Sequence, residues 1–189
     1  LLFPNRWAMK FAVGYAILMN KTAGIVLAGG RSSRMGTNKA LLRYQNVPLV
    51  EHMQNVLRQA GINDVFISGD IPGYNCIHDA ARHAGPVKAM YDLLVRFLPD
   101  YQRILFVPVD MPFLQAGTLR DLLARPGSVY YCDYPLPACL VTSGRREGGE
   151  FRSVRDLLGH WMAQPIPFTA TTKNMANINT HQEWKDIAS

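Results

Sequence analysis

The sequence predicts an α/β fold of three layers, in which helices cover both faces of a mainly parallel sheet. Short apolar runs alternate along the chain with longer segments whose apolar residues recur at helical spacing. Parallel strands buried on both faces read as uninterrupted apolar runs, and each needs a long crossover to reach the next. The alternation therefore favours a Rossmann-like sheet built with right-handed crossovers.

The expected strands are apolar runs bounded by polar or turn-forming residues. The run Ile-Leu-Phe-Val within residues 103–107 is the clearest buried strand. The runs at residues 127–132 and 138–142 are expected to pair with each other. In chain order, strands are expected at residues 24–28, 65–68, 103–107, 127–132, 138–142 and 166–169.

The expected helices carry their apolar residues on one stripe and end at helix-breaking residues. Pro48 begins the first helix, Gly61 ends it, and Pro99 ends the second. In chain order, helices are expected at residues 48–60, 87–97, 118–124, 151–162 and 181–187.

Composition indicates a compact globular protein. A chain of 189 residues is sized for one domain that buries about 70% of its unfolded surface. Its 48% hydrophobic and 18% charged residues exclude disorder. The formal net charge of +6 suits a small polyanionic substrate, and without a basic stripe interleaved with aromatic residues we expect no nucleic-acid partner. Three cysteines without Cys-x-x-Cys spacing indicate reduced thiols in a cytoplasmic protein.

Residues 1–20 are treated as an N-terminal extension and residues 21–189 as a single domain. The apolar stretch at residues 11–19 is too short to span a bilayer, so we expect no membrane association. The status of the extension stays open between an upstream addition, an ordered strand or helix, and a targeting segment.

A glycine-rich, basic loop follows the first expected strand. Residues 27–39 read Leu-Ala-Gly-Gly-Arg-Ser-Ser-Arg-Met-Gly-Thr-Asn-Lys. Glycines let backbone amides approach a ligand closely, and the three cations can neutralise several phosphate charges. The spacing matches neither the Walker A loop nor Gly-x-Gly-x-x-Gly. By composition alone the loop is either a phosphate site or a solvated turn.

A carboxylate follows the clearest strand. Asp110 lies just past the apolar run at residues 103–107. Because parallel strands deliver their carboxyl ends to one edge of a sheet, Asp110 can face phosphates held by the loop at residues 29–39. One or two carboxylates together with substrate phosphates commonly hold Mg²⁺. The alternative is that Asp110 caps the turn that follows it.

Two motifs resemble those of a known family. The string Leu-Ala-Gly-Gly-x-Ser-x-Arg-Met-Gly-x-x-Lys resembles the nucleotide signature of the MobA family of NTP transferases, which includes molybdenum cofactor guanylyltransferase. Val-Pro-Val-Asp-Met-Pro at residues 107–112 resembles the metal motif of that family. The resemblance spans about residues 23–187 in order, and it implies the nucleotide-diphospho-sugar transferase type of α/β fold for a single nucleotidyltransferase domain.

The resemblance also implies an activity. It is the transfer of GMP from GTP to the molybdenum cofactor Mo-molybdopterin, which forms molybdopterin guanine dinucleotide and releases pyrophosphate, with Mg²⁺ as the cofactor. The implied catalytic residues are Arg34, Lys39 and Asp110, with Asp110 as the metal ligand. The implied GTP-binding residues are Leu27, Ala28, Gly29, Gly30, Lys39, Ser68, Asp79 and Asp110.

Three of the implied contacts have plain alternatives. Asp79 offers two acceptors that fit the N1–H and exocyclic amine of guanine, but an Asx-turn is the other interpretation. Asn177 and Asn179 resemble the Asn-x-Asn-Thr close of the family and are candidates for binding the acceptor. Thr180 followed by Glu183 also forms a capping-box pattern, which explains part of this match without function.

Departures from the family pattern keep other functions open. The glycine-rich segment at residues 143–150 is shorter than usual, which puts the acceptor in doubt, and Ser68 stands where guanylyltransferases tend to have asparagine. A cytidylyltransferase or another nucleotidyltransferase of the superfamily is the nearest alternative. A catalytically reduced nucleotide-binding regulator is the alternative from another class, but Lys39 and Asp110 are both present, which favours an enzyme. Transient contact with molybdoenzymes or delivery chaperones is left open.

Overall fold

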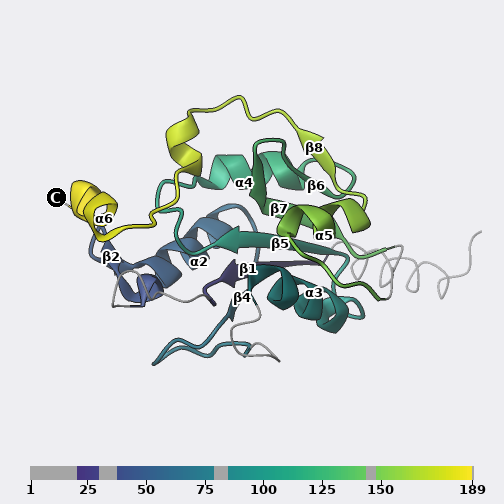
Figure 1. The fold of residues 1–189 in the computed structure, drawn as a ribbon, viewed down its shortest axis with the longest axis horizontal. Helices are drawn as coiled ribbons and strands as arrows, with labels where there is room; N and C mark the ends of the chain where they lie inside the picture. The colour runs from purple at the N-terminus through teal and green to yellow at the C-terminus, as the bar shows by residue number, and fades with distance from the viewer. Residues whose placement is uncertain (1–20, 30–37, 79–84, 144–147, 189) are drawn as a thin grey trace, which may run out of the picture.

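The structure, a computed structural model, describes residues 21–29, 38–78, 85–143 and 148–188 (Figure 1). The predicted N-terminal extension at residues 1–20 lies outside these ranges. So do most of the glycine-rich loop, with Gly30 and Arg34, and the predicted base-reading residue Asp79.

A sheet of six strands in the order β4-β1-β5-β7-β6-β8 forms the centre of the molecule. β1 is parallel to both β4 and β5, and β6 is parallel to β8. β7 is antiparallel to its neighbours β5 and β6, so five strands run in one direction and β7 runs against them. The expected mainly parallel sheet is confirmed. The strands are β1 (Thr22–Leu27), β4 (Asp64–Ser68), β5 (Arg103–Pro108), β6 (Val129–Tyr131), β7 (Tyr134–Val141) and β8 (Gln164–Ile166).

Helices cover the sheet on both faces, as expected (Figure 1). α2 (Leu49–Gln59) and α4 (Ala116–Leu123) pack on one face and share one hydrophobic core. α3 (Pro86–Phe97) and α5 (Val154–His160) pack on the other face around a second core. α6 (His181–Ala188) follows the 3-10 helix η3 (Thr172–Met175) and contacts the small strand β2 (Arg43–Tyr44).

The side chains of the central strands point alternately to the two faces of the sheet, and both faces are buried. This explains why the sequences of these strands are continuous apolar runs. In β1, Val26 belongs to the core beneath α2, whereas Ile25 and Leu27 belong to the core beneath α3. β5 divides in the same way, with Leu105 facing α2 and Phe106 facing α3. Since successive side chains point to opposite faces, both faces of these strands need apolar residues.

Several element boundaries differ from the expected ones. β7 begins at Tyr134, four residues before the expected strand at 138–142, and α5 begins at Val154, where the Ser153 side chain accepts a hydrogen bond from the amide of Asp156. β8 ends at Ile166, where the expected strand was to begin. These shifts change none of the layers.

A small hairpin was not expected at all. β2 pairs antiparallel with β3 (Val47–Pro48), and Gln45 and Asn46 in the connecting turn have φ of 49° and 66°. Positive φ at both central residues is typical of the tight turns that join two antiparallel strands. Each strand has two residues, which is too short for period-two patterning to show.

Two further expectations concern the cysteines and the membrane. Cys76, Cys132 and Cys139 all have free thiols, and Cys139 is buried. Within the part of the chain that the structure describes, no helix has the length and apolar character needed to cross a bilayer.

Candidate active site

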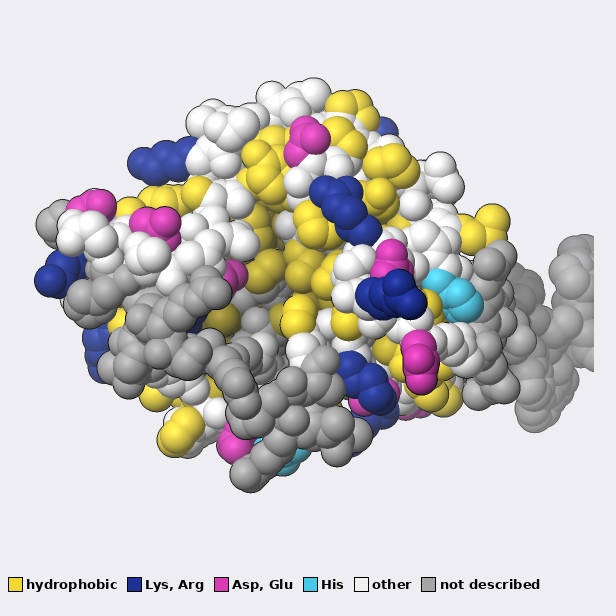
Figure 2. All heavy atoms as spheres, in the orientation of Figure 1, with side chains coloured by type: hydrophobic (Ala, Val, Ile, Leu, Met, Phe, Trp, Pro, Cys, Tyr) yellow, Lys and Arg dark blue, Asp and Glu magenta, His cyan; other side chains and the backbone are white. Residues whose placement is uncertain are grey.

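A cleft of about 530 Å³ opens at the carboxyl ends of β1 and β5. Its lining is largely apolar, and hydrophobic side chains also gather at the middle of the face seen in Figure 2. Both predicted motifs contribute to the lining. The cleft is lined by Leu27, Ala28, Gly29, Asn38, Lys39, Pro86, Pro108, Val109, Asp110, Tyr134, Pro135, Leu136, Met175 and Asn177.

Parallel pairing places the two motifs side by side. Leu27 at the end of β1 is level with Pro108 at the end of β5, and the amide of Val109 donates to the carbonyl of Leu27 over 3.1 Å. On the other side, the amide of Ala28 donates to the carbonyl of Ser68 over 2.8 Å. The start of the glycine-rich loop and Asp110 therefore leave the sheet at the same edge, as predicted.

Gly69 keeps this edge compact. Its φ is +143°, and a Cβ there would lie 2.8 Å from the backbone nitrogen of Gly29 and 3.0 Å from the carbonyl carbon of Ala28. Real Cβ atoms do not approach backbone so closely, so either Gly69 or the loop start would have to move. Only glycine fits between β4 and the beginning of the glycine-rich loop.

Gly69→Ala is expected to lower both stability and nucleotide affinity. The positive φ alone costs about 1–2 kcal/mol for a residue with a Cβ, and the contact with Gly29 adds to that cost. Gly73→Ala is the matched control, because Gly73 has φ of +84° with nothing within 4 Å of the added Cβ. Thermal unfolding and GTP titration of both variants separate the two effects. Equal loss of stability with unchanged GTP affinity in both would contradict this role of Gly69.

Lys39 projects into the cleft from a short, anchored 3-10 helix, η2 (Lys39–Leu41). The Asn38 side chain caps this helix by accepting from the amide of Ala40 over 3.1 Å. Ala40 is fully buried and Leu42 packs against the core beneath α2. These two apolar residues anchor the short helix to the core, whereas Leu41 between them is 39% exposed.

The Lys39 ammonium lies among three oxygens, two from the C-terminal segment and one from the Asp110 turn. Its Nζ donates to the carbonyl of Ile178 over 2.7 Å and to Oδ1 of Asn179 over 3.3 Å. It also lies 3.5 Å from Oδ2 of Asp110, with which it forms an ion pair. The two side chains are 19% and 21% exposed, so solvent screens this pair only partly. Lys39 thus joins the loop, the Asp110 turn and the C-terminal segment.

Asp110 is held firmly at the cleft. Its carbonyl accepts a hydrogen bond of 2.9 Å from the amide of Ile178, and its carboxylate faces Lys39. Burial raises the pKa of the Asp110 carboxyl above 3.8, although the charge of Lys39 opposes that shift. A partly desolvated carboxylate that faces a cleft can bind a cation strongly, since little water has to be displaced from it.

Among the described residues, no three His, Cys, Asp or Glu side chains gather in a way that could hold a metal ion. Asp110 by itself fits a hard divalent ion that takes its remaining ligands from phosphates and water.

The C-terminal segment forms one side of the cleft. Asn177 lines it, and Asn179 contacts Lys39. The predicted capping box is confirmed, because the amide of Glu183 donates to Oγ1 of Thr180 while Glu183 Oε2 accepts from the amides of Thr180 and Asn179 over 3.0 and 2.6 Å. These hydrogen bonds hold the pKa of the Glu183 carboxyl below its ordinary value. The cap orders the turn that follows Asn177.

Not every predicted residue reaches the cleft. Ser68 is 1% exposed, lies beside Ala28 at the end of β4, and is not among the described residues that line the cleft. The predictions for Gly30, Arg34 and Asp79 concern positions outside the described residues.

Sequence reasoning missed an entire wall of the cleft. Tyr134, Pro135 and Leu136 come from the start of β7, and Met175 comes from η3. The Tyr134 ring is held edge-on by Phe168, with 5.7 Å between ring centres. The signal that could have revealed this wall is the run Tyr-Pro-Leu-Pro, which carries large apolar groups where a loop was expected.

The chain is similar to several known proteins. The model of the MobA-like NTP transferase domain matches residues 24–161. A molybdenum cofactor guanylyltransferase of Xanthomonas euvesicatoria pv. vesicatoria is 37% identical over 182 residues, which cover 90% of this chain and 96% of that protein. Three further curated relatives match at 31–35% identity, and the chain spans 53–56% of their lengths.

Solved structures share the fold. Molybdopterin-guanine dinucleotide biosynthesis protein A from Archaeoglobus fulgidus superposes with a TM-score of 0.64 at 18% identity, covering 88% of this chain and 96% of that one. A Mycobacterium tuberculosis protein in complex with manganese superposes with a TM-score of 0.59 at 18% identity, covering 89% and 98%. With a family model that matches most of its length and a relative of 37% identity along nearly all of it, this chain belongs to the MobA-like NTP transferase family.

Proposed function

We propose that this chain is a molybdenum cofactor guanylyltransferase, which transfers GMP from GTP to Mo-molybdopterin and forms molybdopterin guanine dinucleotide and pyrophosphate. The observation that carries the proposal is the meeting of the glycine-rich strand end, Lys39 and Asp110 at one cleft. The 37% identical relative with this name supports the substrates. We further propose that residues 21–189 form a single nucleotidyltransferase domain that works in the cytoplasm, where GTP is available.

The proposed reaction does not require a general base from the protein. The acceptor is a phosphomonoester whose second pKa is about 6, so it is already largely dianionic at neutral pH. It can attack the α-phosphate of GTP without a general base. Catalysis then rests on in-line positioning and on neutralising the charge of the α-phosphate and the leaving pyrophosphate. A cleft with one lysine and one carboxylate suits that task.

The nucleotide side of the cleft is assigned to the glycine-rich loop. Backbone amides around Leu27, Ala28, Gly29 and Gly30 would hold the phosphates, and the Lys39 ammonium would balance their charge. Arg34 would act mainly on turnover. Lys39 would exchange part of its hydrogen bonding from the carbonyl of Ile178 to phosphate oxygens when GTP binds.

Asp110 is assigned to a divalent metal ion. The bound ion, Mg²⁺ in this proposal, would lower the barrier by withdrawing charge from the phosphates. The manganese complex of the Mycobacterium tuberculosis neighbour supports a divalent cation in this fold. The raised pKa of Asp110 and its place on the cleft support it as the ligand.

The acceptor side is assigned to the opposite wall. Asn177 lines the cleft and Asn179 lies beside Lys39, so both are placed to contact a second substrate near the phosphates. The apolar wall of Tyr134 and Leu136 faces the same space and would cover the ring system of the acceptor. Contact with molybdoenzymes or delivery chaperones would occur after transfer.

The preference for one nucleotide base over the others distinguishes the proposed guanylyltransferase from a cytidylyltransferase. Asp79 as a double acceptor predicts GTP over ATP, because adenine has an acceptor at N1 where guanine has a donor. Each lost hydrogen bond to a charged group costs about 1.5–3 kcal/mol, so we expect at least about tenfold discrimination. Thermal shift with GTP, ATP, CTP and UTP in the presence of Mg²⁺ measures it, and GTP at one hundred times its Kd should stabilise by about 2.7 kcal/mol.

The control is Asp79→Asn, which is expected to lose the preference for GTP while still binding nucleotides. Preference for CTP in the wild type would make the protein a cytidylyltransferase. Binding of GTP without any release of pyrophosphate in the presence of the acceptor would make it a nucleotide-binding regulator. Equal binding of ATP and GTP would contradict the role of Asp79.

A further inference from the structure

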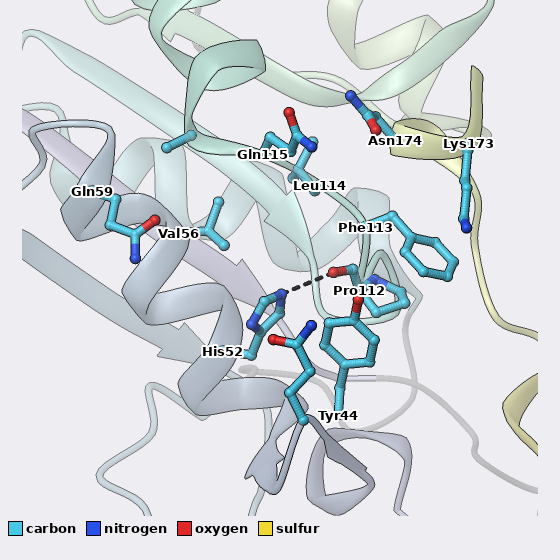
Figure 3. Close-up of a pocket in the computed structure, with 12 residues that line it drawn as sticks. Tyr44, His52, Val56, Gln59, Pro112, Phe113, Leu114, Gln115, Lys173 and Asn174 are labelled. Carbon is cyan, nitrogen blue, oxygen red and sulfur yellow. Dashed lines mark hydrogen bonds between the residues drawn. The ribbon is translucent and has the colours of Figure 1, made fainter. Parts of the chain in front are cut away.

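A second pocket of about 420 Å³ is lined by Pro112 and Phe113, which follow the Asp110 turn in the chain (Figure 3). It opens between α2, the turn of the β2–β3 hairpin, residues 112–116 and η3. Its size is within the range of small-molecule sites, about 300–1,000 Å³. It is lined by Tyr44, Gln45, His52, Val56, Gln59, Pro112, Phe113, Leu114, Gln115, Ala116, Lys173 and Asn174.

This pocket is separate from the candidate active site. The two share no lining residue among the described parts of the chain. Residues 110–112 and η3 form the partition: Asp110 and Met175 line the cleft, whereas Pro112 and Asn174 line the pocket. A ligand in the pocket would lie behind the Asp110 turn and could not reach the α-phosphate of a nucleotide in the cleft.

Aromatic rings give the pocket flat surfaces. Tyr44 meets His52 edge-on with 5.1 Å between ring centres, and it meets Phe113 edge-on at 5.8 Å. The His52 ring is fixed by a hydrogen bond of 2.9 Å between its Nε2 and the carbonyl of Pro112 (Figure 3). Rings locked in this way present a rigid face on which a planar ligand can stack at little entropic cost.

The pocket carries positive charge without a compensating carboxylate in its lining. The Lys173 ammonium lies 4.8 Å from the centre of the Phe113 ring, which holds the cation at the rim. The lining residues include no Asp or Glu. An anionic group on a ligand would therefore meet one cation and no repelling carboxylate.

Four carboxamides complete the lining, those of Gln45, Gln59, Gln115 and Asn174. None of the four side chains forms a hydrogen bond to another residue within the described segments. A carboxamide offers a donor and an acceptor together, which matches the alternating donors and acceptors along the edge of a nitrogen heterocycle.

We propose that this pocket is a second ligand site, which binds a planar nitrogen heterocycle bearing an anionic group. The rings of Tyr44 and Phe113 contact its plane, the carboxamides contact its edge, and Lys173 contacts its anion. Pterins with an acidic substituent and purine nucleoside monophosphates share this chemistry. The site goes beyond the proposed transfer reaction, because it lies behind the partition and holds neither substrate in a reactive position.

The test uses the full chain with its nucleotide cleft filled by saturating Mg²⁺ and a non-transferable α,β-methylene analogue of GTP. The probes are 6-carboxypterin, followed by fluorescence anisotropy, and GMP, followed by calorimetry. We expect saturable binding of at least one probe under these conditions. Tighter binding of the pterin identifies a pterin site, and tighter binding of GMP identifies a purine site.

Substitutions in the lining test whether the probes bind in this pocket. Lys173→Ala is expected to weaken probe binding about fivefold, because it removes the ion pair with the anionic group, and an exposed ion pair contributes up to about 1 kcal/mol. Phe113→Leu is expected to weaken it by a similar factor while keeping apolar bulk. Lys185→Ala is the matched control, because Lys185 is an exposed lysine on α6 outside the pocket. Displacement of both probes by the GTP analogue, or equal affinities in the wild type and the Lys173 and Phe113 variants, would overturn the proposal.

Discussion

Asp110→Asn is expected to lower metal-dependent transfer of GMP by at least about 100-fold, the size of effect seen when a group that stabilises transition-state charge is removed. Asparagine keeps the shape of the side chain and one oxygen but loses the negative charge that a divalent ion requires. Pyrophosphate release at several Mg²⁺ concentrations measures the loss. Asp100→Asn is the matched control, because Asp100 is exposed in the turn after α3 and does not line the cleft. Near-normal pyrophosphate release by the Asp110 variant would show that Asp110 is not the metal ligand.

The same substitution should leave the fold intact or make it more stable. Burial raises the pKa of Asp110 above 3.8, so the folded chain binds this proton more tightly than the unfolded chain. The ionised carboxylate therefore destabilises the fold at neutral pH, and its contribution becomes favourable only as the pH falls through the raised pKa. We expect a melting temperature for Asp110→Asn at pH 7 no lower than that of the wild type.

Lys39→Ala is expected to weaken GTP binding or turnover by well over tenfold, more than the 1.4 kcal/mol that an exposed ion pair rarely reaches. The ammonium is anchored through Ala40 and is held among the carbonyl of Ile178, Asn179 and Asp110, so no exposed cation can replace it. Titration with GTP at low and high salt measures the effect. Because a partly buried cation is screened little, the loss should persist at high salt.

The effect of Lys39→Ala is to be compared with the effects of replacing the two arginines of the loop, Arg31 and Arg34. No apolar anchor follows Arg31 in the sequence, so Arg31→Ala should change binding little, and Arg34→Ala should fall between the two and act mainly on turnover. If all three variants show similar small losses that vanish at high salt, the loop is a diffuse basic patch and the proposed mechanism is wrong.

The centre of the fold was predictable because its strands are buried on both faces. Continuous apolar runs predicted β1 and β5, and their parallel pairing followed from the helical crossovers between them. The juxtaposition of the loop with Asp110 then needed no side-chain detail, since parallel strands end at the same edge. Helix signals at Pro48 and Gly61 predicted α2 to within one residue at each end.

The cleft wall at the start of β7 could not be predicted, because its prolines do not fit the usual sequence pattern of a strand. Pro135 and Pro137 lack the backbone donor that a strand needs, so the start of β7 looks like a loop. In the structure these prolines precede Ala138, where pairing with β5 begins, so no hydrogen bond to β5 is lost. The contact of Lys39 with Ile178 joins residues 139 positions apart and depends on tertiary packing that no local pattern encodes.

In the proposed reaction, GMP passes from GTP to the phosphate of the pterin acceptor in the cleft. The most direct measurement incubates the protein with Mg²⁺, molybdopterin and GTP labelled either at the α- or at the γ-phosphate. We expect the α-label to appear in a guanine dinucleotide and the γ-label in pyrophosphate, and we expect Asp110→Asn to lower both by at least about 100-fold. An α-label that stays in free GTP or GMP while the protein binds GTP tightly would contradict the proposed transfer.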